Sequence, residues 1–511
     1  VKATNYEDRK FAAKLLGKMA DEEFNPFLIE LMSDIHPEVR VAALISAGKV
    51  KRSELLLLLM ENLASHVYEA TAASSLISIG KPALPVLHAY FYKSGQKPEF
   101  MEKIVKLYGE IGGPLAIEFL WQIIDFPDKN IVSAALLALH KCNFQAKNSQ
   151  ATRIKQFIEF DVRNIAWNLA ALLEIPKGEV DTNRHLRNSL RAENKNNFNH
   201  IYMLLSMLYD KQSIQLVKEN IESRTSEGVT FAIELLDVFL DEDIKPYLLA
   251  VLDDIPTEEK LEKLQNIFPR DTYNSAEVLM QIINQDYNNI SPWTKACAIY
   301  VYRKMQNAQV CNDLIANLFN QNQLLKETSA CAIYSLDEKL YHKHTERLGK
   351  EEKAKLDEVI CKENNLDIKF NVPKLRIEKI MFFKSIAALK DTSGTLLDQL
   401  LNFSEVKVYT AGDHFQLAYK NNQSFFYLIH TGHASIYRNN QYLFTANEKE
   451  LIGDILFQEA HLNEYVIMFD EDAIVIHINK YGFYNLMANN VRITQSMVAY
   501  MSNFIQEEVP A

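Results

Sequence analysis

The pentapeptide Ala-Cys-Ala-Ile-Tyr occurs at Ala296–Tyr300 and again, 34 residues later, at Ala330–Tyr334. Self-similarity at this period is typical of stacked helical repeats, in which each helix pair buries its apolar face against the next pair. We therefore predict a helical-repeat solenoid. Its first role would be to present an extended surface and not to enclose a catalytic pocket.

The first 145 residues show a related design. Pro37 opens a helix that reads Val-Arg-Val-Ala-Ala-Leu at Val39–Leu44, and Ile79–Leu84 reads Ile-Gly-Lys-Pro-Ala-Leu. A Gly after the last apolar position permits a left-handed helix cap, and a Pro just beyond it fits the first turn of the next helix. Arg40 is expected to lie near a loop carbonyl or an acidic turn residue. These two patterns resemble HEAT repeats.

Composition limits the class of protein. A chain of 511 residues is too long for one compact core, and its scarce Gly (15) and Pro (14) favour helices. The net charge of −11 argues against a nucleic-acid surface and against anionic lipid. None of the five cysteines forms a CxxC pair, which points to a reducing compartment, and Cys297 and Cys331 lie within apolar helical runs.

No apolar run reaches the 18 to 20 or so residues needed to span a bilayer. The sequence starts at Val1 without a Met and without a signal peptide, so we expect a cytoplasmic segment of a longer chain.

From Lys390 onward the pattern changes to short alternating runs separated by turn residues, which indicates strands. Five strands are expected, at 406–409, 425–429, 434–437, 465–469 and 473–478, before a final helix at about 493–505. The fold class is therefore mostly α, with a smaller β-roll. We predict a HEAT-like α-solenoid over 1–345, a helical linker with leading helices over 346–384, and the β-roll with its C-terminal helix over 385–511.

The order of these strands resembles the cyclic-nucleotide-binding β-roll over about residues 375–506. Leu375–Lys384 is similar to the leading helix of that family, and three glycines match its turn glycines, which need positive φ or close strand approach. These glycines are Gly412, Gly432 and Gly453.

The resemblance places a phosphate-binding cassette at Gly453–Tyr465. Its ribose-binding Glu is replaced by Asp454, its phosphate-binding Arg falls near Asn463, and no Lys or Arg occurs from 455 to 467. Losing a charge-assisted pair weakens anion binding, and the acids Glu459 and Glu464 weaken it further. Helix-terminus amides could hold an anion weakly, and His461 becomes cationic below neutral pH. The candidate ligand residues are Gly453, Asp454, His461 and Asn463, and no cyclic nucleotide is expected to bind.

Other combinations of residues are weaker. His342 and His344 lack further ligands at metal-site spacing, so no metal site is predicted. No nucleophile elbow, Walker loop or HExxH frames a catalytic group, so we expect neither an enzyme nor a cofactor. Trp121, Trp167 and Trp293 are expected in the core.

The combination of HEAT array, Trp293-x-x-Ala-Cys-Ala helix and β-roll is similar to the soluble C-terminal region of bacterial ATP/ADP-translocase-like (major-facilitator) proteins. This resemblance implies a transporter-like membrane domain before residue 1, with the present chain on the cytosolic face. The predicted function is a non-enzymatic regulatory or scaffold module whose solenoid surface binds protein partners. The alternative is a small-molecule, nucleotide-like sensor that regulates an attached transporter. Nucleic acid is not an expected partner.

Overall fold

The computed structural model describes residues 1–19, 21–65, 67–176, 181–286, 289–360, 372–417, 425–453, 464–488 and 493–500. The chain divides into two compact units. The first comprises residues 1–166 and 196–269, and the second comprises residues 167–195 and 270–511. The long helices α10 and α11 each contribute residues to both.

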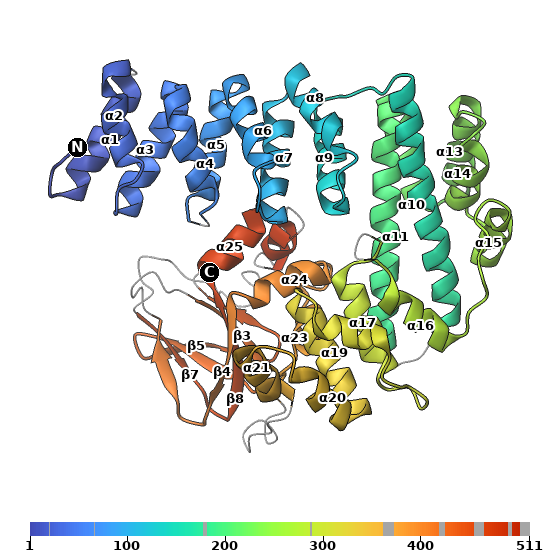
Figure 1. The fold of residues 1–511 in the computed structure, drawn as a ribbon. Helices are drawn as coiled ribbons and strands as arrows, with labels where there is room; N and C mark the ends of the chain where they lie inside the picture. The colour runs from blue at the N-terminus through green and yellow to red at the C-terminus, as the bar shows by residue number, and fades with distance from the viewer. Residues whose placement is uncertain are drawn as a thin grey trace. The chain divides into compact units, whose positions relative to one another are not determined.

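The N-terminal part of the first unit is a stack of helices in two layers (Figure 1). One layer contains α1 (Tyr6–Met19), α3 (Pro37–Val50), α5 (Glu69–Ile79), α7 (Pro98–Ile111) and α9 (Lys129–Lys141). The other contains α2 (Asn25–Leu31), α4 (Leu56–Leu63), α6 (Leu84–Phe91) and α8 (Pro114–Ile123). Short 3₁₀ turns, η1 (Glu22–Phe24), η2 (Ser53–Leu55) and η3 (Lys81–Ala83), precede α2, α4 and α6.

Small residues set the distance between neighbouring helices of the first layer. A Cβ at Gly48 of α3 would lie 2.9 Å from the Cα of Ser75 in α5, and one at Gly109 of α7 would lie 2.9 Å from the Cβ of Ala138 in α9. Gly17 of α1 lies equally tightly against Ser46 of α3. Such close approach explains why the sequence keeps Gly, Ser and Ala at these positions.

Glycines end two helices of this stack with positive φ, as predicted, but their ψ angles of −136° and −170° lie outside the left-handed helical conformation. Gly80 and Gly112 end α5 and α7 with φ of 76° and 65°. The expectation for Arg40 was wrong. Its Nε donates to the side-chain oxygen of Asn62 at 2.7 Å, and its guanidinium lies 4.5 Å from the ring centroid of Tyr68.

Two long helices follow the stack, α10 (Ser149–Glu174) and α11 (Asp181–Leu208). They bury polar pairs against each other: His200 Nδ1 lies 2.5 Å from Asp161 Oδ2, and the Asn168 amide donates to Asn194 at 2.8 Å. Four shorter helices complete the first unit, namely α12 (Lys211–Glu222), α13 (Ser226–Phe239), α14 (Lys245–Leu252) and α15 (Thr257–Gln265).

Within the described ranges, no helix is both long and apolar enough to cross a membrane.

The helices of the second unit carry the repeated pentapeptide. They are α16 (Ser275–Asn284), α17 (Pro292–Tyr302), α18 (Asn312–Leu318), α19 (Gln323–Leu336), α20 (Glu338–Thr345) and α21 (Lys350–Ile360). The two copies lie on α17 and α19, which contact each other. Cys297, Ala298, Ala330 and Ala332 are completely buried, as expected for the apolar face of a repeat.

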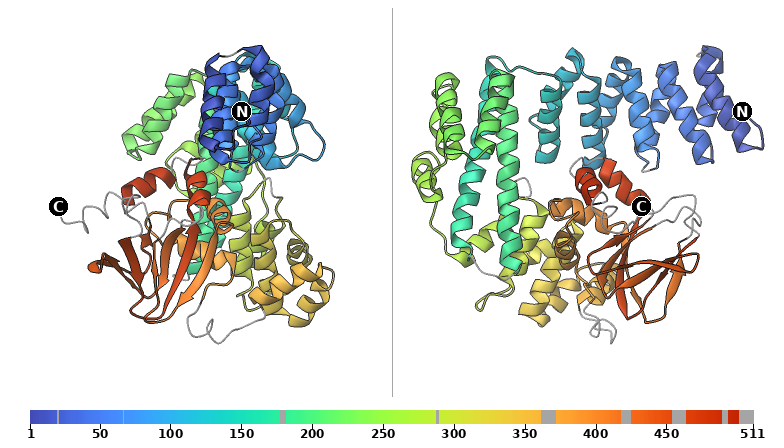
Figure 2. Two further views of the ribbon diagram at one scale, coloured as in Figure 1. Left: turned by 90° about the vertical axis from the view of Figure 1, so that its left-hand side faces the viewer. Right: turned by 180° about the vertical axis from the view of Figure 1, so that it is seen from behind.

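The β-roll consists of two antiparallel four-stranded sheets, with strand orders β1-β8-β3-β6 and β2-β7-β4-β5 (Figure 2). Its strands are β1 (Ser404–Tyr409), β2 (His414–Gln416), β3 (Phe425–Thr431), β4 (Ala434–Arg438), β5 (Gln441–Ala446), β6 (Leu451–Ile452), β7 (Tyr465–Met468) and β8 (Ala473–Asn479). Helices α23 (Arg376–Lys384), α24 (Gly394–Leu401) and α25 (Lys480–Ala488) belong to this part, and residues 493–500 form the start of the predicted final helix as far as the structure describes it. All five predicted strands and the leading helix are present.

One hydrophobic core joins the repeat helices of this unit to the β-roll. Trp293 of α17, Phe383 of α23, Leu397 of α24 and Phe426 and Ile476 of the first sheet belong to the same buried cluster. Gly394 at the start of α24 lies so close to the Trp293 ring that any side chain there would collide with it. Helices α23 and α24 therefore connect the roll to α17 and α19.

Candidate functional site

The predicted cassette begins where strand β6 ends. Gly453 follows β6 directly, and a Cβ at this position would collide with the ring of Phe426 on β3. This glycine is needed for close packing, whereas Gly412 and Gly432 have positive φ of 92° and 81°. The other three predicted site residues, Asp454, His461 and Asn463, lie outside the described residues, as does 454–463 as a whole.

The far end of the cassette is held by an ion pair that the sequence did not reveal. Arg438, the last residue of β4, donates from Nε to Glu464 Oε2 at 2.8 Å, and the amide of Asn439 donates to the same oxygen at 3.3 Å. Glu464 raises the pKa of Arg438. The pair lies at the rim of the β-roll. The guanidinium carbon of Arg438 is also 5.4 Å from the ring centroid of Tyr465. The guanidinium of Arg438 thus lies next to the cassette, but it is already paired with the carboxylate of Glu464.

Aromatic side chains occupy the space between the two sheets. Tyr409 stacks on Phe469 with ring centroids 4.3 Å apart, and Phe415 lies 4.9 Å from Tyr427. Tyr427 in turn meets the ring of His477 edge-on at 4.8 Å. In a β-roll of this type, a ligand inside the barrel would have to displace this cluster, because protein interiors are close-packed.

His477 is a buried histidine in contact with this aromatic cluster. It is 4% exposed, and in the first sheet it lies between its register neighbours Glu405 on β1 and Tyr427 on β3. Its Nε2 is joined to the Tyr409 hydroxyl by a hydrogen bond of 2.9 Å. Burial, helped by the nearby Lys407, lowers the pKa of His477 to about 4, although Glu405 opposes the shift. The imidazole is therefore neutral at physiological pH.

The leading helix α23 is tied to the repeat helices by polar contacts as well as by the shared core. The hydroxyl of Tyr300 on α17 donates to Glu378 Oε1 at 3.0 Å. The backbone N–H of Arg376 donates to Glu327 of α19 at 3.1 Å. Burial raises the pKa of Glu327, so this contact lies in a site from which water is largely excluded.

The helix stack of the first unit presents a ridge of exposed side chains. The Gly–Ser contacts put Lys14, Ile45 and Ser74 at equivalent positions on α1, α3 and α5, and the Gly–Ala contact relates Lys106 and Leu137 on α7 and α9 in the same way. One turn later, the same register gives Lys18, Lys49, Ser78, Glu110 and Lys141. We call these ten residues the ridge.

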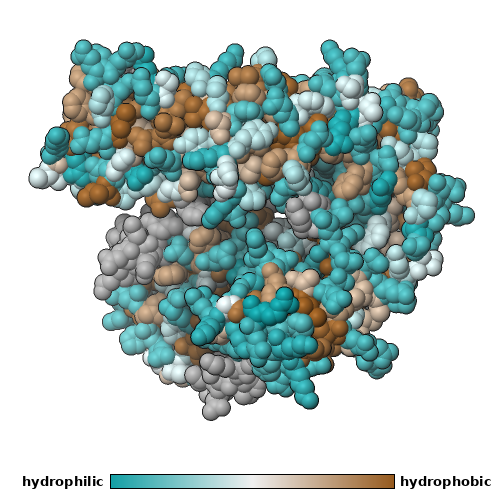
Figure 3. Space-filling model, viewed as in Figure 1, coloured by the Kyte–Doolittle hydropathy of each residue, from teal (hydrophilic) through white to brown (hydrophobic). Residues whose placement is uncertain are grey.

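Two exposed apolar side chains, Ile45 and Leu137, lie among the charged and Ser residues of the ridge. Ile45 and Leu137 are 47% and 48% exposed, which is high for large aliphatic residues. Figure 3 shows apolar residues that interrupt the hydrophilic surface over the helix stack. Apart from Lys141, which pairs with Glu110 at 2.7 Å, the ridge lysines make no ion pair with another described residue. Within a chain of net charge −11, this stripe is locally cationic.

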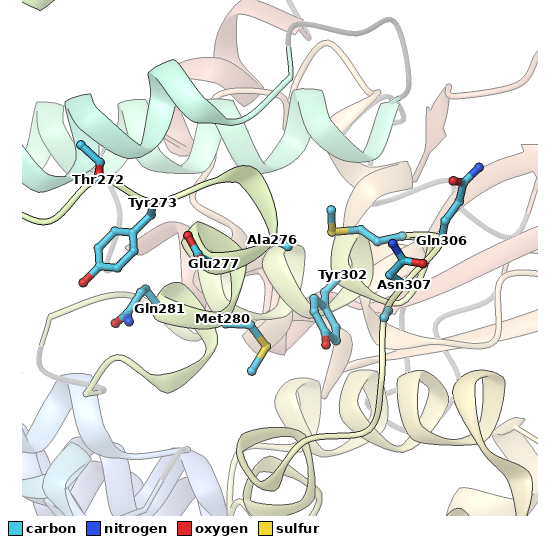
Figure 4. A pocket seen from close by; sticks show the side chains of 11 residues that line it. Thr272, Tyr273, Ala276, Glu277, Met280, Gln281, Tyr302, Gln306 and Asn307 are labelled. Atoms are coloured by element: carbon cyan, nitrogen blue, oxygen red, sulfur yellow. The ribbon is translucent and has the colours of Figure 1, made fainter.

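A cavity of about 760 Å³ lies between α16 and the turn that follows α17 (Figure 4). Its lining includes Tyr273, Met280, Tyr302 and Met305. The sequence analysis did not identify it, because its residues come from two separate segments and form no motif.

The predicted histidine and tryptophan positions divide between surface and interior. His342 is at the surface, where its Nε2 lies 3.6 Å from Glu338, but Nδ1 of His344 is buried and has no hydrogen-bond partner among the described residues. Trp293 is buried at 4% exposure, whereas Trp121 and Trp167 are half-buried. Among the described residues, no group of three or more His, Cys, Asp or Glu is placed to hold a metal ion.

Comparison with known proteins gives one family match and several distantly similar solved structures. Residues 1–76 match the family model of HEAT repeats. No curated protein matches the chain. Among solved structures, the sensor domain of the transcriptional regulator DNR from Pseudomonas aeruginosa is 16% identical, with a TM-score of 0.23, and the match covers 25% of this chain and 94% of that one.

Two protein kinase regulatory chains are also similar. The regulatory subunit of a cAMP-independent protein kinase A from Trypanosoma brucei is 14% identical (TM-score 0.22), with 26% of this chain and 47% of that chain covered. The regulatory domain of Toxoplasma gondii PKA, solved with cAMP, is 14% identical (TM-score 0.21), with 24% and 49% covered. The match thus spans about half of each regulatory chain. The protein is mostly helical, its residues 1–76 match HEAT repeats, and its C-terminal part contains a β-roll of two antiparallel four-stranded sheets.

Proposed function

We propose that this protein is a non-enzymatic regulatory scaffold whose helix stack binds a protein partner. The observation that carries the proposal is the ridge on α1, α3, α5, α7 and α9, where exposed Ile45 and Leu137 lie among lysines. Exposed apolar side chains within a polar surface are typical of interaction sites. The lysines favour a partner that is acidic around its apolar contacts, because opposite potentials guide association and exclude wrong partners.

The β-roll serves, in this proposal, as a docking and regulatory element and not as a cyclic-nucleotide receptor. Three observations support this assignment. Aromatic side chains cluster between the two sheets, Glu464 is paired with the neighbouring Arg438, and Asn463 stands where the resemblance expects the cassette Arg. The contacts from Tyr300 and Glu327 to α23 would transmit any change in the roll to the repeat helices.

The family resemblance extends the proposal to a cellular context. We propose that the chain is the cytosolic part of a bacterial membrane protein with a transporter-like domain before residue 1, and that the scaffold recruits a partner to it. The full reading frame tests this directly: a chain without membrane-spanning helices upstream would contradict it. The second candidate function, a nucleotide-like sensor, rests on the cyclic-nucleotide-binding-like roll and on residues 454–463.

The scaffold proposal is tested by affinity capture from native cells with three forms of the full chain. These are the wild type, a ridge variant (Ile45→Asp with Leu137→Asp), and a control (Leu216→Asp with Phe231→Asp) that alters apolar residues of similar exposure on α12 and α13. We expect a protein that the wild type and the control retain and the ridge variant loses by about tenfold or more, equivalent to about 1.4 kcal/mol. Identical capture by all three forms would contradict a partner on the ridge.

A further inference from the structure

The cavity between α16 and the turn after α17 has an apolar floor. Tyr302 is 7% exposed, and its hydroxyl is already committed, since it donates to the carbonyl of Gln309 at 3.1 Å and accepts from the N–H of the same residue at 3.2 Å. The ring is therefore what Tyr302 offers to a ligand. Met280 and Met305, both half-buried, complete the floor. Thioether side chains adapt to apolar groups of different shape.

The rim of this cavity carries carboxamides. Gln281, Gln306 and Asn307 are all exposed and line the opening (Figure 4). Each carboxamide offers both a donor and an acceptor, which is the combination that an extended peptide backbone requires. The cavity thus offers an apolar floor to one side chain of a bound peptide and polar carboxamides to the main chain of that peptide.

Glu277 is the one charged side chain among the described residues that line the cavity. One of its oxygens accepts from the backbone N–H of Asn274 at 2.8 Å, which holds the carboxylate in place. The Tyr273 hydroxyl donates to Asp271 at 3.3 Å. None of the described lining residues is basic, and the ammonium of the adjacent Lys304 lies 5.0 Å from the ring of Tyr300.

We propose that this cavity binds an extended peptide segment that places an apolar side chain on the methionine floor and a neighbouring basic side chain beside Glu277. Its volume of about 760 Å³ is within the usual range for ligand sites and can hold a few residues. The negative potential from Glu277 and Asp271 selects the basic neighbour. This site is separate from the ridge, and its test does not depend on a ridge partner.

The test follows the methyl signals of ¹³C-methyl-methionine in the full chain, with Met280 and Met305 assigned by Met280→Leu and Met305→Leu. The probes are the peptide acetyl-Ser-Phe-Lys-Ser-amide and its counterpart with Glu in place of Lys. The Lys peptide should shift both methyl signals and saturate with a Kd on the order of 1 mM, and the Glu peptide should bind at least about fivefold more weakly. The other methionines among the 13 in the chain are internal controls.

A charge variant separates the basic preference from simple apolar binding. Glu277→Gln keeps the capping box of α16, because Gln can replace Glu at this position. It should bring the affinities of the two peptides within about twofold of each other. Equal binding of both peptides by the wild type would show an apolar small-molecule cleft and overturn the proposal. Unshifted Met280 and Met305 signals at about 5 mM of the Lys peptide would overturn it as well.

Discussion

The hydroxyl of Tyr409 on β1 lies 2.9 Å from Nε2 of His477 on β8, in the aromatic interior of the β-roll. Burial raises the pKa of Tyr409 to about 12 and lowers that of His477 to about 4, so both groups are uncharged over the physiological range. A hydrogen bond between two neutral groups satisfies their polar atoms without burying a charge. This pair therefore makes the stability of the roll depend on pH.

We predict that the β-roll loses stability as the pH falls from about 6.5 to about 4. In this window the unfolded chain binds a proton at His477, with an ordinary pKa of about 6.5, and the folded chain does not. The contribution of His477 to the free energy of unfolding should therefore decrease with falling pH, by about 1–3 kcal/mol, and become constant below about pH 4. His477→Gln should remove this part of the pH dependence, measured as the midpoint of urea unfolding at each pH.

The matched control for this prediction is His414→Gln, because His414 is exposed on β2. It should keep the pH dependence of the wild type. An NMR titration of the His477 ring gives an independent test. If the Cε1 signal of His477 titrates near pH 6.5 in the folded protein, the imidazole is not held neutral and the prediction fails.

Enlarging the alanines of the repeated pentapeptide should destabilise the second unit. Ala298 on α17 and Ala332 on α19 are completely buried, so Trp at either position must displace packed neighbours. Overpacking of this kind costs about 1–3 kcal/mol or more. Denaturant midpoints of Ala298→Trp and Ala332→Trp measure the effect. Ala70→Trp, at an exposed position of α5, should change the midpoint by no more than about 0.5 kcal/mol.

Gly453→Ala tests the packing at the start of the cassette. The added methyl group would meet the completely buried ring of Phe426, and we expect a loss of about 1–3 kcal/mol. Phe426→Leu removes the ring atoms with which the methyl collides. The double variant should therefore be more stable than the sum of the two single effects predicts, by about 0.5 kcal/mol or more. Additive effects would mean that the cost of Gly453→Ala has another origin.

Cyclic AMP and cyclic GMP should not bind the full chain with a Kd at or below about 10 µM, near −7 kcal/mol. The reasons are the aromatic cluster between the two sheets, the Arg438–Glu464 pair and the expected replacement of the cassette Arg near Asn463. Isothermal titration calorimetry is the measurement. A Kd in the low micromolar range would instead favour the sensor function.

A triple variant tests whether the cassette has lost only its ligand chemistry. Asp454→Glu restores a longer carboxylate, Asn463→Arg restores the cation, and Glu464→Ala frees Arg438 from its partner. Weak nucleotide binding by this variant, absent from the wild type, would support a degenerate cassette. If it folds normally and binds nothing, the aromatic interior is the dominant barrier. Adding Tyr427→Ala should then open the site.

The sequence predicted the strands whose side chains alternate between two buried environments. β3 and β8 carry Phe426 and Ile476 toward the helices and Tyr427 and His477 toward the second sheet. β2, β5 and β6 were not predicted. Three residues or fewer are too short to show a period in β2 and β6, and β5 (Gln441–Ala446) is mostly exposed. The helices α10 and α11 were not predicted as 26- and 28-residue elements, because they bury Asp161 and Asn168 where a regular apolar stripe would be expected.

The candidate sites were less predictable than the fold, because they depend on contacts between distant residues. Arg438 lies 26 residues before Glu464, and nothing in the local sequence relates them. The cavity on α16 likewise combines Met280 with Tyr302 and Met305. For Arg40 the repeat pattern gave its position on the helix but not its partner. The side chain of Asn62 and the ring of Tyr68 stand where a loop carbonyl or an acidic turn residue was expected.

The contact between Gly394 and Trp293 has a consequence for how this protein can be divided and recombined. A β-roll excised from residue 370 onward would leave Trp293 behind and expose the side of α24 that this ring covers. The roll is thus not an independent domain that can be grafted onto another protein by itself. The smallest transferable piece of the chain must carry α17 and α19 with it, so shuffling of gene segments would preserve this part only as a block.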